Sequence, residues 1–111
     1  MQIYVIENNG IYKIGISYNA RARLQMLGIS KSAKIVLCEE FERAKFCEHI
    51  LHNVFHHKHV RLNKKRDGST EWFNLNNEDL YTAKTIISEF KNNGPEILLK
   101  YIEYNGPRQL H

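Results

Sequence analysis

Four residues in the first half of the chain have the chemistry to act together on a phosphate. Tyr4 carries a phenol, Lys13 an amine and Arg23 a guanidinium, and all three lie near the N-terminus. Further along, Glu48 supplies a carboxylate that could bind a divalent metal ion. In-line attack on a phosphodiester needs an activated water, a cation at the developing negative charge, and help for the leaving oxygen. These residues therefore need elements that bring them together.

A β-hairpin is predicted at the N-terminus. Residues 2–6 and 11–16 are rich in Tyr, Val and Ile, which favour strands, and Asn9-Gly10 is a strong turn signal.

The register of this hairpin decides which side chains are neighbours. If Glu7 faces Gly10, then Tyr4 faces Lys13, and residues directly opposite each other share a face of the sheet. Tyr4 and Lys13 would then be adjacent. The other face, which we expect to be the core face, would carry Ile3, Val5, Tyr12, Ile14 and Ile16.

A helix is expected next, over about residues 20–27, with Asn19 as its N-cap and Gly28 at its end. Arg21 and Arg23 differ by about 200° around such a helix, given ~3.6 residues per turn, so only one of them can face a given phosphate. A third strand is predicted over residues 34–40.

A longer helix is predicted over residues 42–57, where apolar side chains repeat at steps of three and four. Glu48 and His52 lie four residues apart and share one edge of this helix, beside its apolar stripe.

The rest of the chain divides into three parts. Residues 60–70 are basic and turn-like, and the aromatic pair Trp72-Phe73 then adds a strand edge and is expected in the core. Residues 77–92 form an amphipathic helix. Residues 1–93 are thus predicted as one domain, and residues 94–111 as a separate terminal segment with a short helix.

Composition limits the possible classes of protein. The chain has 111 residues, 42% hydrophobic and 25% charged, as expected for a soluble globular domain. No apolar run is long enough for a membrane span and no signal-peptide pattern opens the chain, so a cytoplasmic location is expected. The two cysteines, Cys38 and Cys47, are expected to be reduced and packed among apolar residues.

The formal net charge is +4, which favours polyanionic partners. Much of the positive charge is clustered, and the cluster is interpreted either as a solvated loop or as an arm that contacts phosphates. Its members are Lys58, Arg61, Lys64, Lys65 and Arg66.

Taken in order, these pieces resemble the GIY-YIG nuclease domain, in the phage and viral branch of the T5orf172 type. The resemblance covers about residues 2–75. It rests on Ile3-Tyr4-Val5, Lys13-Ile14-Gly15, Asn19 through Arg23-Leu24, Ala44 to Glu48 with His52, and Glu71-Trp72-Phe73.

The resemblance implies a single-metal endonuclease that cuts DNA. Tyr4 would be the general base or would position the attacking water, Arg23 would stabilise the charge on the phosphorane, and Glu48 would hold Mg²⁺ or Mn²⁺. Arg21 is expected to contact phosphate or to lie in solvent. The fold class would be α+β, with a small, mainly antiparallel three-stranded sheet flanked by helices.

Three positions depart from the family pattern. Lys13 replaces the second tyrosine, and its ammonium would favour the phenolate of Tyr4. Leu27 stands where many members carry a histidine, a role that His52 could fill. The late asparagine of the family is either Asn63 or Asn74.

Other interpretations stay open. The chain could be a nucleic-acid-binding module that kept the fold and lost cleavage, or a protein-interaction module acting through residues 95–111. A zinc site at His52 and His56 is disfavoured, because the sequence has no matching cysteine pair and no clear third ligand. Either a monomer or a homodimer is expected.

Overall fold

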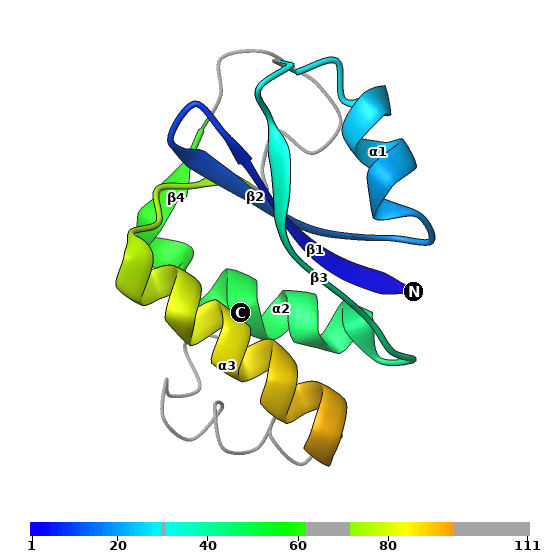
Figure 1. The fold of residues 1–111 in the computed structure, drawn as a ribbon. Coiled ribbons are helices and arrows are strands. Elements are labelled where there is room, and N and C mark those ends of the chain that lie inside the picture. The colour runs from blue at the N-terminus through cyan, green and yellow to red at the C-terminus, as the bar shows by residue number, and fades with distance from the viewer. Residues whose placement is uncertain (30, 62–71, 95–111) are drawn as a thin grey trace.

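A computed structural model describes residues 1–29, 31–61 and 72–94. In these ranges a five-stranded antiparallel sheet carries three α-helices, and its strand order is β3-β1-β2-β5-β4 (Figure 1). The strands are β1 (Gln2–Asn8), β2 (Ile11–Ser17), β3 (Lys34–Glu40), β4 (His59–Val60) and β5 (Trp72–Phe73). The helices are α1 (Ala20–Met26), α2 (Ala44–Val54) and α3 (Asn77–Asn93), with a short 3₁₀ helix η1 (His56–Lys58) after α2.

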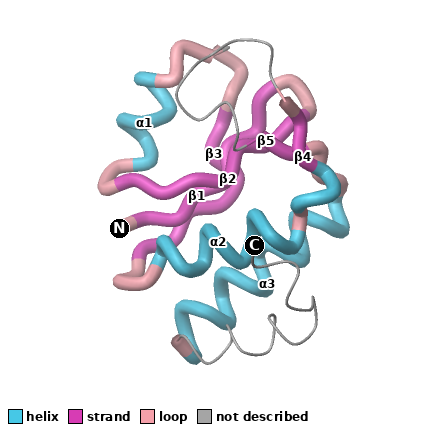
Figure 2. The backbone as a smooth tube through the Cα atoms, turned by 180° about the vertical axis from the view of Figure 1, so that it is seen from behind, coloured by secondary structure: helices cyan, strands magenta, loops and turns pink. Residues whose placement is uncertain are grey.

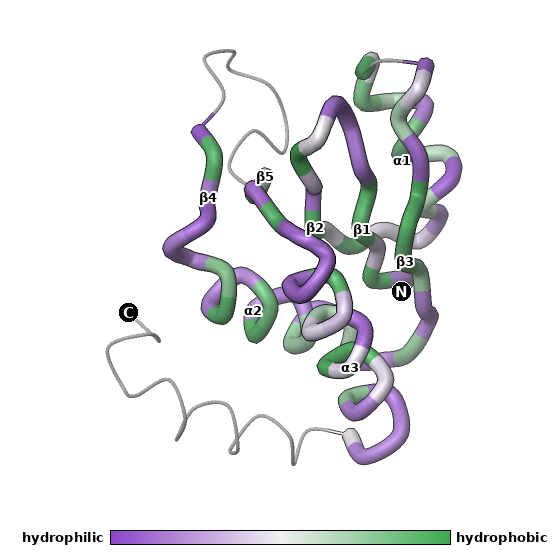
Figure 3. Tube along the Cα trace, turned by 60° about the vertical axis from the view of Figure 1, so that its left-hand side comes forward, coloured by the Kyte–Doolittle hydropathy of each residue, from purple (hydrophilic) through white to green (hydrophobic). Residues whose placement is uncertain are grey.

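The helices cover the sheet from two sides. On one face, α2 and α3 bury the predicted core residues of the hairpin, among them Ile3, Val5 and Ile14. On the other face, α1 packs through Ala20 against Tyr4 and Ile6 (Figures 1 and 2). Hydrophobic and hydrophilic residues alternate along α2 and α3 in Figure 3, as expected of helices with one apolar side. The sheet therefore separates two packed layers.

The register of the β1–β2 hairpin differs from the predicted one. Asn8 pairs with Ile11, so the turn holds only Asn9 and Gly10, both with positive φ (53° and 85°). The predicted pairing of Glu7 with Gly10 would put Asn8 and Asn9 in the two central positions of the turn, which both need positive φ. Asn9-Gly10 fills these positions more readily, because glycine has no Cβ, and this explains the observed register.

As a result, Tyr4 pairs with Gly15, and Lys13 pairs with Ile6 instead of Tyr4. The slip moves each pairing by two residues along one strand, which preserves the faces because side chains alternate with period two. Tyr4 and Lys13 still share a face, as diagonal neighbours.

The prediction of a three-stranded sheet is also wrong, since the described residues form a sheet of five strands. The strand edge at Trp72-Phe73 is confirmed, but β4 was not predicted, because its two residues follow directly on the predicted helix. That helix ends at Val54, earlier than residue 57, and its last turn becomes η1. Cys47 is buried as expected, whereas Cys38 is exposed and not packed.

The other predicted elements are confirmed to within a residue or two. Asn19 caps α1, with its Oδ1 accepting a hydrogen bond of 3.1 Å from the backbone N–H of Ala22. The predictions on Asn63, Lys64, Lys65, Arg66 and Glu71, and on the terminal segment after Gly94, fall outside the described residues. Within the described ranges, no helix has both the length and the apolar character to cross a membrane.

Candidate active site

Tyr4 lies at the centre of the candidate site. It stands in the middle of β1 and is only 1% exposed. Its ring lies over Gly15 of β2, where an added Cβ would come within 2.5 Å of the phenol oxygen and 2.8 Å of Cζ. The Tyr4 ring can take this position only because residue 15 is a glycine. The sequence analysis did not predict this role for Gly15.

Arg23 approaches Tyr4 from α1. The start of this helix is fixed by a 2.7 Å hydrogen bond from the backbone N–H of Ala20 to Oε1 of Gln2. From there the half-buried Arg23 reaches the Tyr4 phenol and donates a hydrogen bond to it. Arg21 is exposed. Of the two arginines, Arg23 is the one that the structure brings to the phenol.

The charge of Glu48 acts on the same phenol from α2, in the opposite layer. Burial raises the pKa of Tyr4, the hydrogen bond and charge of Arg23 lower it, and the charge of Glu48 raises it again. The net shift is upward from 10.0, so Tyr4 is a neutral phenol near pH 7. The cation that lowers the pKa of Tyr4 is Arg23, and the predicted action of Lys13 on this phenol stays a prediction.

His52 connects α2 to β2 through a hydrogen bond. Its Nε2 lies 2.9 Å from the carbonyl oxygen of Ile14. In the described residues, β5 pairs with β2 only at Tyr12 and Lys13. Ile14 is the next residue of β2, so His52 contacts this strand just beyond the part that pairs with β5. Since a carbonyl oxygen can only accept, Nε2 carries the hydrogen, and Nδ1 of the neutral ring is an acceptor.

The surroundings of His52 keep its ring neutral. Burial lowers the pKa of His52 from 6.5; the Ile14 carbonyl and Glu48 raise it, and His49 and Lys13 lower it. Lys13 is itself fully buried, an unusual state for a lysine and one that is common at functional sites. The charges of Glu48 and Lys13 both act on the imidazole, so His52 belongs to the same site.

Glu48 fits the metal that the family resemblance implies. It is half-buried on α2, it acts on both Tyr4 and His52, and its carboxylate is the hard oxygen ligand that Mg²⁺ and Mn²⁺ prefer. One carboxylate suffices for Mg²⁺ when water and phosphate oxygens complete its shell. Across the described ranges, no three His, Cys, Asp or Glu side chains are placed to hold a metal ion together, which leaves the zinc interpretation without support.

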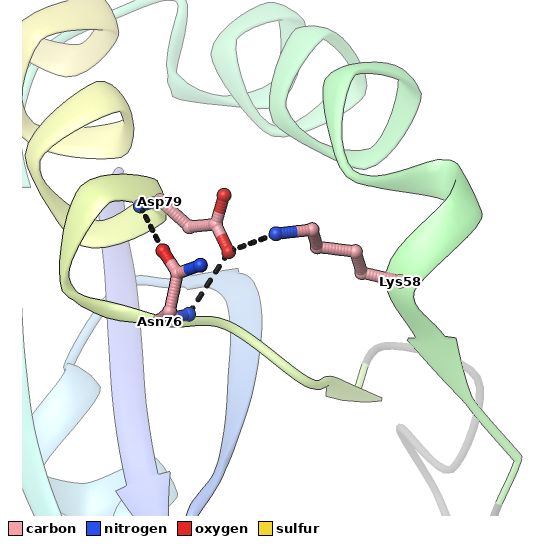
Figure 4. A network of polar contacts seen from close by, with 3 residues as sticks. All are labelled: Lys58, Asn76 and Asp79. Atoms are coloured by element: carbon pink, nitrogen blue, oxygen red, sulfur yellow. Dashed lines mark hydrogen bonds and ion pairs between the residues drawn. The ribbon is translucent and has the colours of Figure 1, made fainter.

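The predicted nucleic-acid contacts are spread more widely. The ammonium of Lys58 pairs with Asp79, whose carboxylate also accepts a 2.9 Å hydrogen bond from the backbone N–H of Asn76 (Figure 4). Lys58 thus has a partner within the protein, whereas Arg61 is exposed. Asn74 is exposed too, and its backbone N–H donates to the carbonyl of Lys58 at 2.8 Å.

Comparison with known proteins agrees with this arrangement. A family model described as the T5orf172 domain matches residues 1–88, a range that includes Tyr4, Lys13, Arg23, Glu48 and His52. The match indicates a nuclease-like or DNA-binding module. No curated protein and no solved structure matches the chain.

Proposed function

Because this chain belongs to the T5orf172 domain family, we propose that it is a divalent-metal-dependent endonuclease that hydrolyses phosphodiester bonds in DNA. The observation that carries the proposal is the setting of the Tyr4 phenol. Arg23 and Glu48 both act on it, although their helices cover opposite faces of the sheet. Packing alone would not require the charges of a guanidinium and a carboxylate from opposite layers both to act on one buried phenol.

The edge of β2 explains how the two layers meet. His52 reaches the Ile14 carbonyl at this edge, and Glu48 lies one helical turn before His52 on the same side of α2. The carboxylate therefore lies one helical turn along α2 from this contact, and its charge acts on Tyr4.

Each side chain has a role that suits its state. Tyr4, a neutral phenol, positions the attacking water, and Arg23 stabilises the negative charge that develops on the phosphate. Neutral His52 holds or moves a proton at Nδ1, because Nε2 is engaged by Ile14. Buried Lys13 adds positive charge next to the imidazole.

Glu48, together with water and phosphate oxygens, would hold the Mg²⁺ or Mn²⁺ ion. When bound, such an ion acts as a Lewis acid that polarises the phosphoryl oxygen.

The test compares Glu48→Gln with wild type on plasmid, single-stranded DNA and RNA, each with Mg²⁺ or Mn²⁺. We expect Glu48→Gln to abolish cleavage and to leave DNA binding largely intact, because the ion is lost while the binding surface stays. Glu42→Gln is the matched control, since this glutamate is exposed just before α2 and should keep wild-type activity.

Two outcomes would contradict the proposal. Wild-type cleavage by Glu48→Gln would remove the carboxylate from the mechanism. Tight DNA binding by a wild-type protein that cuts no substrate with either ion would identify a non-catalytic nucleic-acid-binding module.

A further inference from the structure

A cavity rich in histidine opens beside the candidate active site. Its volume is about 310 Å³, and it is formed by α2, η1, β4 and β5. The residues that line it are His49, His52, Asn53, His56, His59 and Phe73. Only His52 has a place in the mechanism above.

The cavity has aromatic walls and a fixed amide. The rings of His52 and His59 both meet Phe73 edge to face, with centroids 5.1 and 5.6 Å away. Asn53 is held by a 3.0 Å hydrogen bond from its Nδ2 to the carbonyl of His49. Phe73 is buried, whereas His56 and His59 are exposed.

This lining selects for a particular kind of ligand. None of the six described lining residues is acidic, and the imidazoles offer N–H donors as well as ring faces. A metal ion is a poor fit, because the described histidines include no group of three placed to bind one. Hydrogen-bond donors beside aromatic rings suit a ligand that combines a phosphate with a flat base.

Size and position agree with a nucleotide. The volume lies at the lower end of the range for small-ligand pockets, which suits one nucleotide better than a base pair. Glu48 and His52 lie roughly 6 Å apart along the axis of α2, at ~1.5 Å per residue. Phosphates of one strand are spaced about 3.4 Å along a duplex axis, so for a strand that runs along α2 the cavity lies one or two nucleotides from a phosphate at Glu48.

We propose that this cavity is a subsite for one nucleotide of the substrate strand next to the scissile phosphate. The inference rests on the proposed function and names a binding site within it. His56 and His59 hold the nucleotide from one side, and His52 connects the subsite to the reacting phosphate.

The test uses His56→Asn and His59→Asn, each combined with Glu48→Gln so that the substrate stays intact. Binding of a single-stranded DNA oligonucleotide is followed by fluorescence anisotropy. Each added substitution should weaken Kd roughly 5- to 150-fold, the range found when a base loses its stacking partner. His57→Asn is the matched control, because His57 is an exposed neighbour in η1 that does not line this cavity. It should leave Kd unchanged.

Kinetics of the single variants with an intact Glu48 give a second measurement. KM should rise with kcat little changed, because a subsite of this kind binds ground state and transition state alike. Thermal unfolding checks that each variant is folded. If His59→Asn is unstable, His56→Asn still tests the proposal, because His56 is exposed and lies outside the sheet.

Three results would overturn the proposal. The first is an active wild-type enzyme together with histidine variants that both keep its Kd and KM. This result would rule out the subsite and would not affect the proposed function. The second is loss of Zn²⁺ binding in the variants with DNA affinity intact, which identifies a metal site. The third is an NMR shift of the His56 ring with deoxynucleoside monophosphate but none with the oligonucleotide, which identifies a site for free nucleotides. A wild-type protein that neither binds nor cuts DNA would instead refute the proposed function itself.

Discussion

The charges of Arg23 and Glu48 shift the pKa of Tyr4 in opposite directions, so this pKa reports on the state of the site. Burial raises the pKa, and only Arg23 opposes that shift. Arg23→Gln should therefore raise the pKa of Tyr4 further, as measured by ¹³C NMR titration of its Cζ. The same substitution should slow cleavage by roughly 10²–10³, the usual cost of losing a fixed donor at a developing oxyanion.

Arg21→Gln is the control for this prediction, since Arg21 is exposed on the same helix. It should change neither the titration of Tyr4 nor the rate of cleavage. A larger effect of Arg21→Gln than of Arg23→Gln on either quantity would show that the wrong arginine has been assigned to the site.

Gly15 tests the placement of the Tyr4 ring by geometry alone. Alanine in a strand is normally favoured over glycine by roughly 0.5–1 kcal/mol. At position 15, however, the new Cβ would fall 2.5 Å from the phenol oxygen, so the ring must move. We expect Gly15→Ala to shift the Tyr4 NMR signals and to lose most of the cleavage activity.

Gly28→Ala provides the comparison for Gly15. Its Cβ would meet nothing within 4 Å, but its φ of +62° is costly for alanine. It should lower the melting temperature and leave the signals of Tyr4 in place. Unchanged Tyr4 signals in Gly15→Ala would mean that the ring does not lie over this glycine.

Among the elements, α3 has a cap whose contribution depends on pH. Burial alone would raise the pKa of Asp79, but hydrogen bonds from Lys58 and from the Asn76 backbone outweigh it and lower the pKa below 3.8. A carboxyl with a depressed folded pKa stabilises the fold above its unfolded pKa of about 3.9, and the stability is lost as the pH falls through the folded pKa. Asp79 should therefore contribute fully at pH 7 and lose its contribution in acid.

Asp79→Asn should lower the free energy of unfolding at pH 7 by about 1 kcal/mol, the usual size of a cap, and should reduce the loss of stability below pH 4. Urea unfolding at several pH values measures both effects. Glu78→Gln is the control, because Glu78 lies in the same first turn without a place in the capping box. Equal effects of the two substitutions would show that the helix dipole, and not the cap, is responsible.

Local sequence signals identified most elements, and the errors arise where pairing depends on distant residues. Asn19 and Gly28 marked the ends of α1 correctly because capping is local. The predicted hairpin register was wrong because it paired Glu7 with Gly10, whereas Asn9-Gly10 itself fills the two central positions of the turn. Strand β4 has two residues, too few for any periodicity, and it depends on pairing with β5.

In the candidate site, too, most local signals were interpreted correctly and features that depend on distant residues were missed. Arg23, Glu48 and His52 were predicted at the site, and the structure places each beside another predicted residue. The predicted pairing of Tyr4 with Lys13 directly across the hairpin was wrong, because it depended on the register, which places Gly15 opposite Tyr4. Gly15 carried a usable signal, since a glycine inside a strand often marks a close approach by another group. The histidine cavity joins residues from four elements, which no local pattern reveals.

At the scale of the whole molecule, the net charge of +4 should govern the affinity for DNA. We expect neutralising Lys64, Lys65 and Arg66 together to weaken binding about equally on all sequences. The slope of log K against log salt should flatten by about 0.9 for each duplex phosphate that the protein no longer neutralises. Turnover at saturating DNA should change little, because these charges bind ground state and transition state alike.

Replacing Lys84, an exposed lysine on α3, provides the control for charge alone. Identical salt dependence in wild type and the triple variant would place the DNA path elsewhere, near Lys100 and Arg108 by sequence.

The pairing of β4 with β5 has an evolutionary consequence. His59 pairs with Phe73 and Val60 with Trp72, so residues 61–71 leave and re-enter the sheet at neighbouring points. Doubling the length of such a connection costs only about 0.6 kcal/mol in closure entropy. Tyr4, Arg23 and Glu48 belong to other elements, β1, α1 and α2. Insertions there can therefore give descendants of this chain new target preferences while the reacting groups keep their places.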